Sequence, residues 1–242
     1  MSAPTRRALL ATAAVAGLGA ALSAGCAKAG QAVHGDHGID EDIANLTPDQ
    51  ALAKLTEGNA RFVAMTEVEP NLSTMRLMAV AKGQRPFVGV LGCVDSRVPP
   101  ELVFDRGLGD VFDTRIAGAI ADDAAIGSLE FGVDEFEVPL VVVLGHSRCG
   151  AVTAAVTTSR GGPRPPGRIG AVVDPIIPAV KAVQGQGIAA DALVNASARE
   201  VVRRSVAALR DSPVLTERLE SGRLKVVGAF YDLDTGKVEF VD

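Results

Sequence analysis

The sequence predicts an α/β fold in which a central, mostly parallel β-sheet is flanked by helices in a Rossmann-like, three-layer arrangement. Short apolar runs rich in β-branched residues alternate with segments of helical periodicity, which is typical of parallel strands joined by helices. Turn-forming residues bound these runs. The 242 residues, 48% hydrophobic and 22% charged, suffice for one such domain and a leader segment. We expect about four parallel strands and one antiparallel edge strand.

The first expected element of the domain is a helix near its start. Thr47 can cap this helix, Pro48 suits its first position, and Gln50 completes a capping box. Apolar residues then recur at helical spacing as far as Val63. Residues 86–92 form a short apolar run bounded by turn residues, and they predict a buried strand.

The rest of the chain continues this alternation of helix and strand. The Val-Val-Val-Leu run at 141–144 is the clearest strand signal, whereas the prolines, glycines and arginines of 160–168 indicate a loop. In chain order we expect a short helix at 99–104, a strand at 111–116, a helix at 122–136, a strand at 138–144, a helix at 149–158, helices across 171–209 with a break at 185–187, a helix between 212 and 222, a strand at 224–230, and a turn at 234–236 leading into an edge strand at 237–241.

A leader precedes the predicted domain. Arg6 and Arg7 stand before the apolar run of 8–22, which is shorter than the ~20 residues of a membrane span and suits a signal peptide with a twin-arginine export motif. The Ser-Ala-Gly-Cys sequence ending at Cys26 resembles a bacterial lipobox, and ordinary cleavage that discards Cys26 is the alternative. We expect a signal peptide at 1–30, a flexible linker at 31–46 and the folded domain at 47–242.

This leader predicts that the protein is exported, either to the cell envelope or into the medium. A lipidated Cys26 would tether it to the outer face of the cytoplasmic membrane. The composition also argues against nucleic acid as a partner, because the net charge is −5 at pH 7 and the chain has no Trp and one Tyr.

Two segments carry side chains that bind metals. Cys93, Asp95 and Arg97 follow the strand expected at 86–92, and His146 and Cys149 follow the strand expected at 138–144. In proteins with parallel sheets, ligands bind at the carboxyl ends of the strands. A set of two thiolates and one imidazole favours zinc. We therefore predict one zinc ion per subunit on Cys93, His146 and Cys149. The fourth tetrahedral position stays free, which is typical of a catalytic zinc.

The residues also suggest how such a site would act. Zinc with an open position lowers the pKa of bound water to about 7, and the zinc-bound hydroxide attacks an electrophilic carbon. Asp95 can accept a hydrogen bond from this water or close the fourth position itself, and Arg97 can orient Asp95 through a forked ion pair. The alternatives are a disulfide between Cys93 and Cys149, two small core cysteines, or an ordinary Asp95–Arg97 ion pair.

From residue 46 to residue 242 the sequence resembles the β-class carbonic anhydrases. The resemblance implies zinc-dependent, reversible hydration of carbon dioxide to bicarbonate and a proton by zinc-bound hydroxide. The stretches that carry it most strongly are residues 92–101 (Gly-Cys-Val-Asp-Ser-Arg-Val-Pro-Pro-Glu), 107–110 (Gly-Leu-Gly-Asp), 138–152 and 226–232.

The resemblance also implies residue roles and an assembly. It makes Cys93, His146 and Cys149 the zinc ligands and Asp95 with Arg97 the catalytic dyad. Some members have a closed state in which this Asp binds zinc, so Asp95 also counts among the expected metal-binding residues. Members form dimers, often paired into tetramers, with active sites near the subunit interface. We therefore expect a homodimer or tetramer acting on carbon dioxide and bicarbonate.

Three residues depart from the family pattern. Arg106 stands where many members have Gln, Ala119 where many have Asn, and Arg148 where a small or polar residue is common. None is an expected metal ligand. They leave two alternatives open: hydrolysis of a carbon dioxide analogue, such as carbonyl sulfide or carbon disulfide, on the same zinc, or an exported zinc-binding protein without catalysis.

Overall fold

The structure, a computed structural model, describes residues 45–190 and 192–241. The expected signal peptide at 1–30 and almost all of the expected linker at 31–46 lie outside the described residues, so the leader and the lipidation of Cys26 stay predictions. Among the described helices, none has the length and apolar character needed to cross a membrane.

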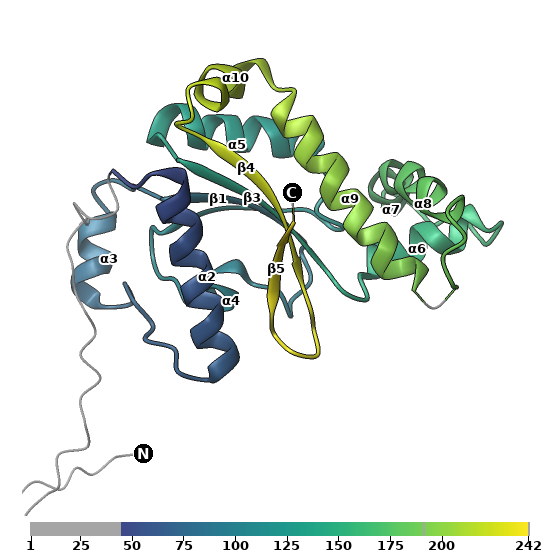
Figure 1. Ribbon diagram of the computed structural model, residues 1–242, viewed down its shortest axis with the longest axis horizontal. Helices are drawn as coiled ribbons and strands as arrows, with labels where there is room; N and C mark the ends of the chain where they lie inside the picture. The colour runs from purple at the N-terminus through teal and green to yellow at the C-terminus, as the bar shows by residue number, and fades with distance from the viewer. Residues whose placement is uncertain (1–44, 191, 242) are drawn as a thin grey trace, which may run out of the picture. The chain divides into compact units, whose positions relative to one another are not determined.

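A five-stranded sheet forms the centre of the described chain (Figure 1). Its strands are β1 (Val88–Gly92), β2 (Val111–Arg115), β3 (Leu140–His146), β4 (Lys225–Tyr231) and β5 (Val238–Val241), in the spatial order β2-β1-β3-β4-β5. The first four run parallel, and β5 pairs antiparallel with β4 at one edge. The predicted sheet of four parallel strands and an antiparallel edge strand is confirmed.

Helices flank this sheet close to the expected positions. In chain order they are α2 (Pro48–Ala64), α3 (Thr74–Val80), α4 (Pro100–Val103), α5 (Asp123–Phe136), α6 (Gly150–Ser159), α7 (Ile169–Val173), the 3₁₀ turn η1 (Asp174–Ile176), α8 (Ile177–Gln184), α9 (Leu193–Arg210) and α10 (Pro213–Glu220).

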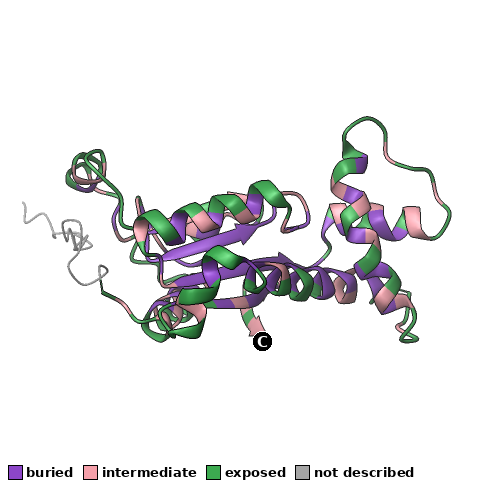
Figure 2. Ribbon diagram, turned by 90° about the horizontal axis from the view of Figure 1, so that it is seen from above, coloured by how far each residue is buried: buried purple, intermediate pink, exposed green. Residues whose placement is uncertain are grey.

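The alternation of side chains along β3 explains the three layers. Val141 and Val143 pack in a cluster with side chains of α5 and α9, whereas Leu140, Val142 and Leu144 pack in a second cluster with side chains of α2 and α4. All residues of β3 are therefore buried, which Figure 2 shows as purple strands between helices with green outer faces.

The strand order places a topological switch point between β1 and β3. The chain adds β2 on one side of β1 and later adds β3 on the other side. Residues 89–92 of β1 pair in register with residues 141–144 of β3, so the carboxyl ends of the two strands lie side by side. Ligands of open α/β sheets bind at such a point.

The capping box expected at the start of α2 is present. The Gln50 N–H donates to Thr47 Oγ1 over 3.3 Å, and the Thr47 N–H donates to Gln50 Oε1 over 2.8 Å. These bonds satisfy backbone donors that have no partner within the helix.

Helix α3 was not predicted, and its burial pattern shows why. Met75 and Met78 are exposed by 71% and 66%, whereas Arg76 is buried and lies 3.1 Å from the buried carboxylate of Asp110. The polarity of this helix is thus the reverse of an ordinary amphipathic pattern. Hydrophobic periodicity cannot reveal a helix that is held by a buried ion pair.

The region 171–209 is more divided than expected. Its break at 185–187 is confirmed, but α7, η1 and α8 also subdivide the part before it. Pro175 and Pro178 lie in the first turns of η1 and α8. Proline has a fixed φ and no backbone N–H, so it suits the start of a new helical segment rather than the interior of a long one.

Candidate metal centre

The carboxyl ends of β1 and β3 bring together the residues expected to bind metal. Cys93 directly follows β1, His146 is the last residue of β3, and Cys149 is the N-cap residue of α6. One potential ligand atom from each of the three lies within 4.8 Å of the other two. All three side chains are buried, with exposed fractions of 4%, 1% and 2%. We call Cys93, His146 and Cys149 the Cys-His-Cys cluster.

The chemical state of the two cysteines distinguishes between the alternatives. Both are free thiols in the structure, so Cys93 and Cys149 are not joined by a disulfide. A hydrogen bond from the Cys149 side chain lowers the pKa of Cys93, against the opposing effect of burial. The same bond raises the pKa of Cys149. A metal ligand must be a thiolate, so binding a divalent cation to this pair would release protons.

His146 has the orientation of a metal ligand. Its Nδ1 lies 2.9 Å from the carbonyl oxygen of Ser147, which makes Nδ1 the protonated nitrogen that donates this bond. Its Nε2 is buried and has no hydrogen-bond partner. A buried polar atom without a partner is costly, and a neutral imidazole fixed at Nδ1 by a carbonyl presents Nε2 as a ligand. The donor set therefore fits a metal ion, and two sulfurs with one imidazole suit zinc.

Asp95 and Arg97 form the ion pair expected from the sequence. Arg97 Nε donates to Asp95 Oδ1 over 2.9 Å, and Arg97 Nη2 donates to Asp95 Oδ2 over 2.8 Å. The Arg97 backbone N–H also donates to Oδ1 over 3.0 Å. These bonds hold the pKa of Asp95 below its usual range, although burial acts in the opposite direction.

Asp95 lies beside the Cys-His-Cys cluster and is not one of its three members. Its Oδ2 is 3.8 Å from His146 Nε2, and both of its oxygens accept bonds from Arg97. The structure thus shows Asp95 in the position of the expected dyad. Its role as a metal ligand stays a prediction.

Residues at the end of β2 hold the Cys93 side of the site, and sequence reasoning assigned them no role. Arg115 Nε donates to the Cys93 carbonyl over 2.8 Å, and its Nη2 donates to the Asp95 carbonyl over 2.5 Å. The Gly118 N–H donates to Cys93 Sγ over 3.3 Å. Gly118 has φ +83°, which favours glycine. An arginine near the end of the strand predicted at 111–116 and a glycine just after that strand were the available signal.

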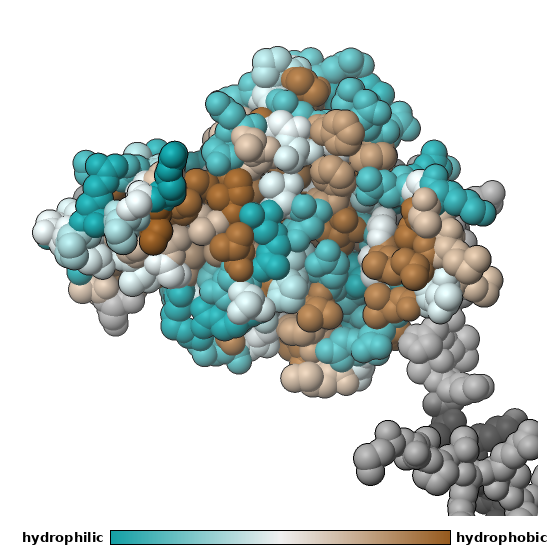
Figure 3. All heavy atoms as spheres, turned by 180° about the vertical axis from the view of Figure 1, so that it is seen from behind, coloured by the Kyte–Doolittle hydropathy of each residue, from teal (hydrophilic) through white to brown (hydrophobic). Residues whose placement is uncertain are grey.

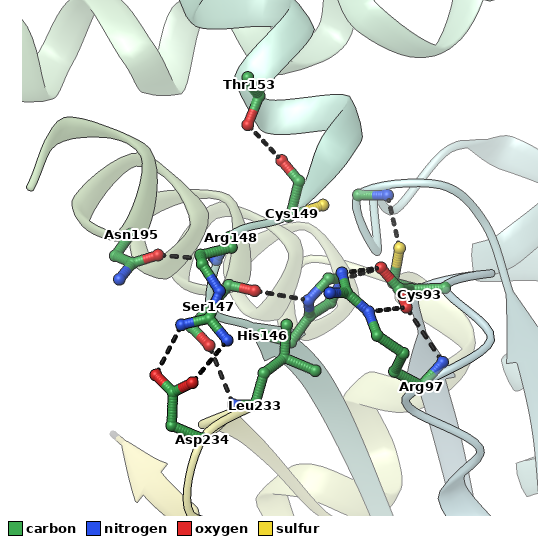
Figure 4. A network of polar contacts seen from close by, with 12 residues as sticks. Cys93, Arg97, His146, Ser147, Arg148, Cys149, Thr153, Asn195, Leu233 and Asp234 are labelled. Carbon is green, nitrogen blue, oxygen red and sulfur yellow. Dashed lines mark hydrogen bonds and ion pairs between the residues drawn. The ribbon is translucent and has the colours of Figure 1, made fainter. Parts of the chain in front are cut away.

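The His146 side of the site is held by other elements (Figure 4). Ser147 and Arg148 contact the turn between β4 and β5 and the first turn of α9. Asn195 and Asp234 are the partners that sequence reasoning missed, because both lie far from the motif along the chain.

Arg106 and Ala119, the other two residues that depart from the family pattern, lie in the body of the domain. Arg106 donates to the carbonyl of Lys54 in α2, and its guanidinium lies 5.5 Å from the centre of the Phe87 ring. Ala119 is fully buried and has φ +54°. That left-handed backbone favours Gly or Asn, which gives a physical reason for the Asn common at this position in the family.

Comparisons with known proteins agree with this geometry. A family profile described as carbonic anhydrase matches residues 88–238. A Mycobacterium tuberculosis protein named carbonic anhydrase 2 is 40% identical over 199 residues, which cover 82% of this chain and 95% of that protein.

Solved structures show the same likeness. A β-carbonic anhydrase of the fungal pathogen Aspergillus fumigatus has a TM-score of 0.63 at 29% identity, covering 80% of this chain and 90% of the other. A structure from the report of two tetrameric β-carbonic anhydrases of the ascomycete Sordaria macrospora also has a TM-score of 0.63, at 25% identity over 68% of this chain and 85% of the other. The fold, the Cys-His-Cys cluster and these similarities agree, and the chain belongs to the β-class carbonic anhydrase family.

Proposed function

We propose that the chain hydrates carbon dioxide reversibly to bicarbonate and a proton, using one zinc ion per subunit held by Cys93, His146 and Cys149. The observation that carries the proposal is the unpartnered Nε2 of His146, buried beside two free thiols. Three protein ligands leave a fourth zinc position for a small molecule, which suits catalysis better than a purely structural site.

The proposed mechanism depends on how Asp95 is held. When bound, zinc supplies hydroxide near neutral pH, because it lowers the pKa of a coordinated water to about 7. Asp95 remains ionised next to Arg97, so its carboxylate only accepts hydrogen bonds. With Oδ2 3.8 Å from His146 Nε2, this carboxylate can orient a water beside the cluster by accepting its O–H. Arg97 acts by fixing the direction of the Asp95 oxygens.

We further propose that Asp95 stays off the metal at rest. Both carboxylate oxygens already accept bonds from Arg97. Closing the fourth zinc position with Asp95 would require at least one of these bonds to weaken. The forked pair therefore favours the arrangement that leaves the position free.

A homodimer or tetramer is the proposed assembly. The Sordaria macrospora relatives are tetrameric by their own description, and this chain exposes many large apolar side chains. Figure 3 shows hydrophobic side chains gathered in patches on one face. Such patches favour association, and light scattering should give the mass of two or four chains. Between residues 65 and 108 the exposed large apolar residues are Met65, Val68, Leu72, Met75, Leu77, Met78, Val94, Leu102 and Leu108.

We also propose that the protein acts outside the cytoplasm. The support is the leader alone: paired arginines, an apolar run and a lipobox-like Cys26. Cell fractionation with labelled palmitate separates the two forms of the proposal. Label that is lost on replacing Cys26 by Ser would indicate a lipid anchor, and unlabelled protein in the medium would indicate simple secretion.

The test of the proposed reaction joins elemental analysis with stopped-flow hydration on the purified chain. We expect about one zinc per chain and acidification well above the uncatalysed rate when carbon dioxide is added. Sulfide release from carbonyl sulfide, assayed on the same sample, identifies the analogue hydrolase if hydration is absent. Purified protein that lacks zinc and contains a Cys93–Cys149 disulfide would overturn the whole proposal.

A further inference from the structure

Arg148 lies between two of the proposed metal ligands and has an unusual backbone. Its φ is +53°, in the left-handed region that residues other than Gly, Asn and Asp rarely adopt. Cys149 follows it directly and His146 precedes it by two positions, so this conformation sets the angle between the two ligand side chains. A strained conformation persists only where surrounding contacts hold it.

Two other elements supply those contacts (Figure 4). The Arg148 backbone N–H donates to Asn195 Oδ1, in the first turn of α9, over 2.8 Å. The Arg148 guanidinium donates to Asp234, in the turn between β4 and β5, with Nη1–Oδ2 at 2.6 Å and Nη2–Oδ1 at 2.8 Å. This forked pairing fixes direction as well as distance.

The preceding residue strengthens the same connection. The Ser147 N–H donates to the Tyr231 carbonyl over 2.9 Å, and Ser147 Oγ accepts from the Leu233 N–H over 3.0 Å. Asp232 in turn accepts bonds from the N–H groups of Asp234 and Thr235 and closes the turn. Asp234 is therefore presented to Arg148 by a turn with its own internal bonds.

Arg148 has a different partner from Arg97, which is also an exposed arginine beside the cluster. Arg97 fixes Asp95, which lies 3.8 Å from His146 Nε2. Arg148 has both terminal nitrogens engaged by Asp234, a carboxylate outside the Cys-His-Cys cluster. Its side chain is directed toward the turn between β4 and β5 (Figure 4).

We propose that Arg148 is a positioning residue, which with Asp234 and Asn195 holds residues 146–149 so that His146 and Cys149 keep a bound metal ion from leaving. The proposal rests on the proposed function in taking the cluster to be the metal site. An isolated exposed ion pair contributes little to stability. The Arg148–Asp234 pair differs, because it fixes a residue that has a left-handed backbone conformation and lies between His146 and Cys149.

The first test is the rate at which the zinc-loaded, full-length chain loses metal to excess EDTA. We expect Arg148→Ala and Asp234→Asn each to accelerate the loss about tenfold, which is typical when a partner of a metal ligand is removed. The double variant should lose metal no faster than either single variant, because both changes remove the same bond. Arg148→Gly removes the ion pair but suits the positive φ of this position. Metal loss as fast as in Arg148→Ala would support the role of the ion pair. Metal loss at the rate of the parent would overturn that role, because it would assign the effect to backbone strain alone.

Arg199→Ala is the matched control. Arg199 is an exposed arginine of α9 that pairs with Glu239 over 2.8 Å and lies over the Phe230 ring, and neither partner belongs to residues 146–149. We expect its metal loss to match that of the parent. Equal rates for Arg148→Ala, Asp234→Asn and the parent would overturn the proposal, as would an effect of Arg148→Ala without one of Asp234→Asn.

Amide hydrogen exchange of residues 146–150 gives a second readout that needs no metal. We expect faster exchange there in Asp234→Asn than in the parent or in Arg199→Ala, because the segment loses its outer attachment. If the chain proves to hold no zinc, the proposed function fails, while this measurement still decides whether Arg148 positions the segment. Unchanged exchange would overturn the positioning role.

Discussion

The loop after β1 and the loop after β3 contribute side chains to the same Cys-His-Cys cluster, but the fold holds the two loops differently. Arg115, the last residue of the adjacent strand β2, donates to the backbone carbonyls of Cys93 and Asp95, and the Gly118 N–H beyond that strand donates to Cys93 Sγ. The loop of residues 146–149 is also bonded to a strand end, because the Ser147 N–H donates to the Tyr231 carbonyl at the end of β4. In addition it has an exposed ion pair, with Arg148 and Asp234 exposed by 52% and 68%. Both loops therefore have bonds to a neighbouring strand end, and the second loop is also held by an ion pair in contact with solvent.

This difference has a chemical consequence. The backbone of the first loop is fixed by Arg115, so the side chains of Asp95 and Arg97 pair with each other and are available for the proposed catalytic role. In the second loop, Arg148 is itself used for support. One loop thus carries one proposed metal ligand and the proposed dyad, and the other carries two proposed ligands and the ion pair that attaches the loop to the turn between β4 and β5.

The largest expected effect is common to both loops. Replacing Cys93 or Cys149 by Ser should lower zinc affinity by more than about 100-fold, beyond the usual effect of losing a partner of a ligand. Stability should fall with it, because metal binding energy contributes to folding. Elemental analysis and thermal unfolding measure both, and stoichiometric zinc in Cys149→Ser would contradict the ligand assignment.

Asp95→Asn should separate catalysis from metal binding in the first loop. We expect hydration to fall about 10²- to 10⁴-fold, the usual range for losing a group that acts on a proton. Zinc content should be retained, because Asp95 lies outside the Cys-His-Cys cluster. Stopped-flow hydration with elemental analysis checks this. Loss of zinc instead would mean that Asp95 is a ligand.

Gly118→Ala should damage the support of the first loop. The added Cβ would lie 2.7 Å from Ile176 Cδ1 at a φ of +83°, so we expect a loss of about 2 kcal/mol in unfolding free energy and weaker zinc binding. Gly187→Ala is the matched control, since Gly187 has φ +74° and open space around it. It should cost about 1 kcal/mol and leave zinc affinity unchanged. Equal effects in denaturant titrations would remove any special role of Gly118.

Salt should produce the smallest effect, which we expect to see in the ion pair of the second loop. Raising ionic strength from 0.1 to 1 M shortens the screening length from about 10 Å to about 3 Å. The exposed Arg148–Asp234 pair should weaken, so the difference in zinc loss between the parent and Asp234→Asn should shrink about twofold. A difference that does not depend on salt would show that the pair acts by geometry rather than by charge.

Much of the site was accessible from the sequence, for a physical reason. Cys93 and His146 lie at the ends of apolar runs, and the ends of neighbouring parallel strands meet at one edge of a sheet. The free thiols at Cys93 and Cys149 also agree with the metal alternative rather than the disulfide. The two cysteines and the histidine at these strand ends therefore predicted the cluster from the sequence alone.

The supports of the site could not be found in the same way. Arg148 and Asp234 are 86 residues apart along the chain, and nothing in either local sequence indicates the other. Helix α3 was hidden for a related reason, since its buried residue is Arg76 and its methionines are exposed. Local periodicity reports how apolar residues sort between core and solvent, and it is silent on polar pairs that form across the fold.

The amino-acid sequence by itself determined the α/β class, and it predicted a site at two strand ends with Cys93, Asp95, Arg97, His146 and Cys149, because these follow from local patterns and residue types. Only the tertiary structure decided that His146 Nε2 is left without a partner, that Asp95 is engaged by Arg97, and that Arg148 supports its loop. Those outcomes depend on which distant groups the folded chain brings within hydrogen-bonding distance.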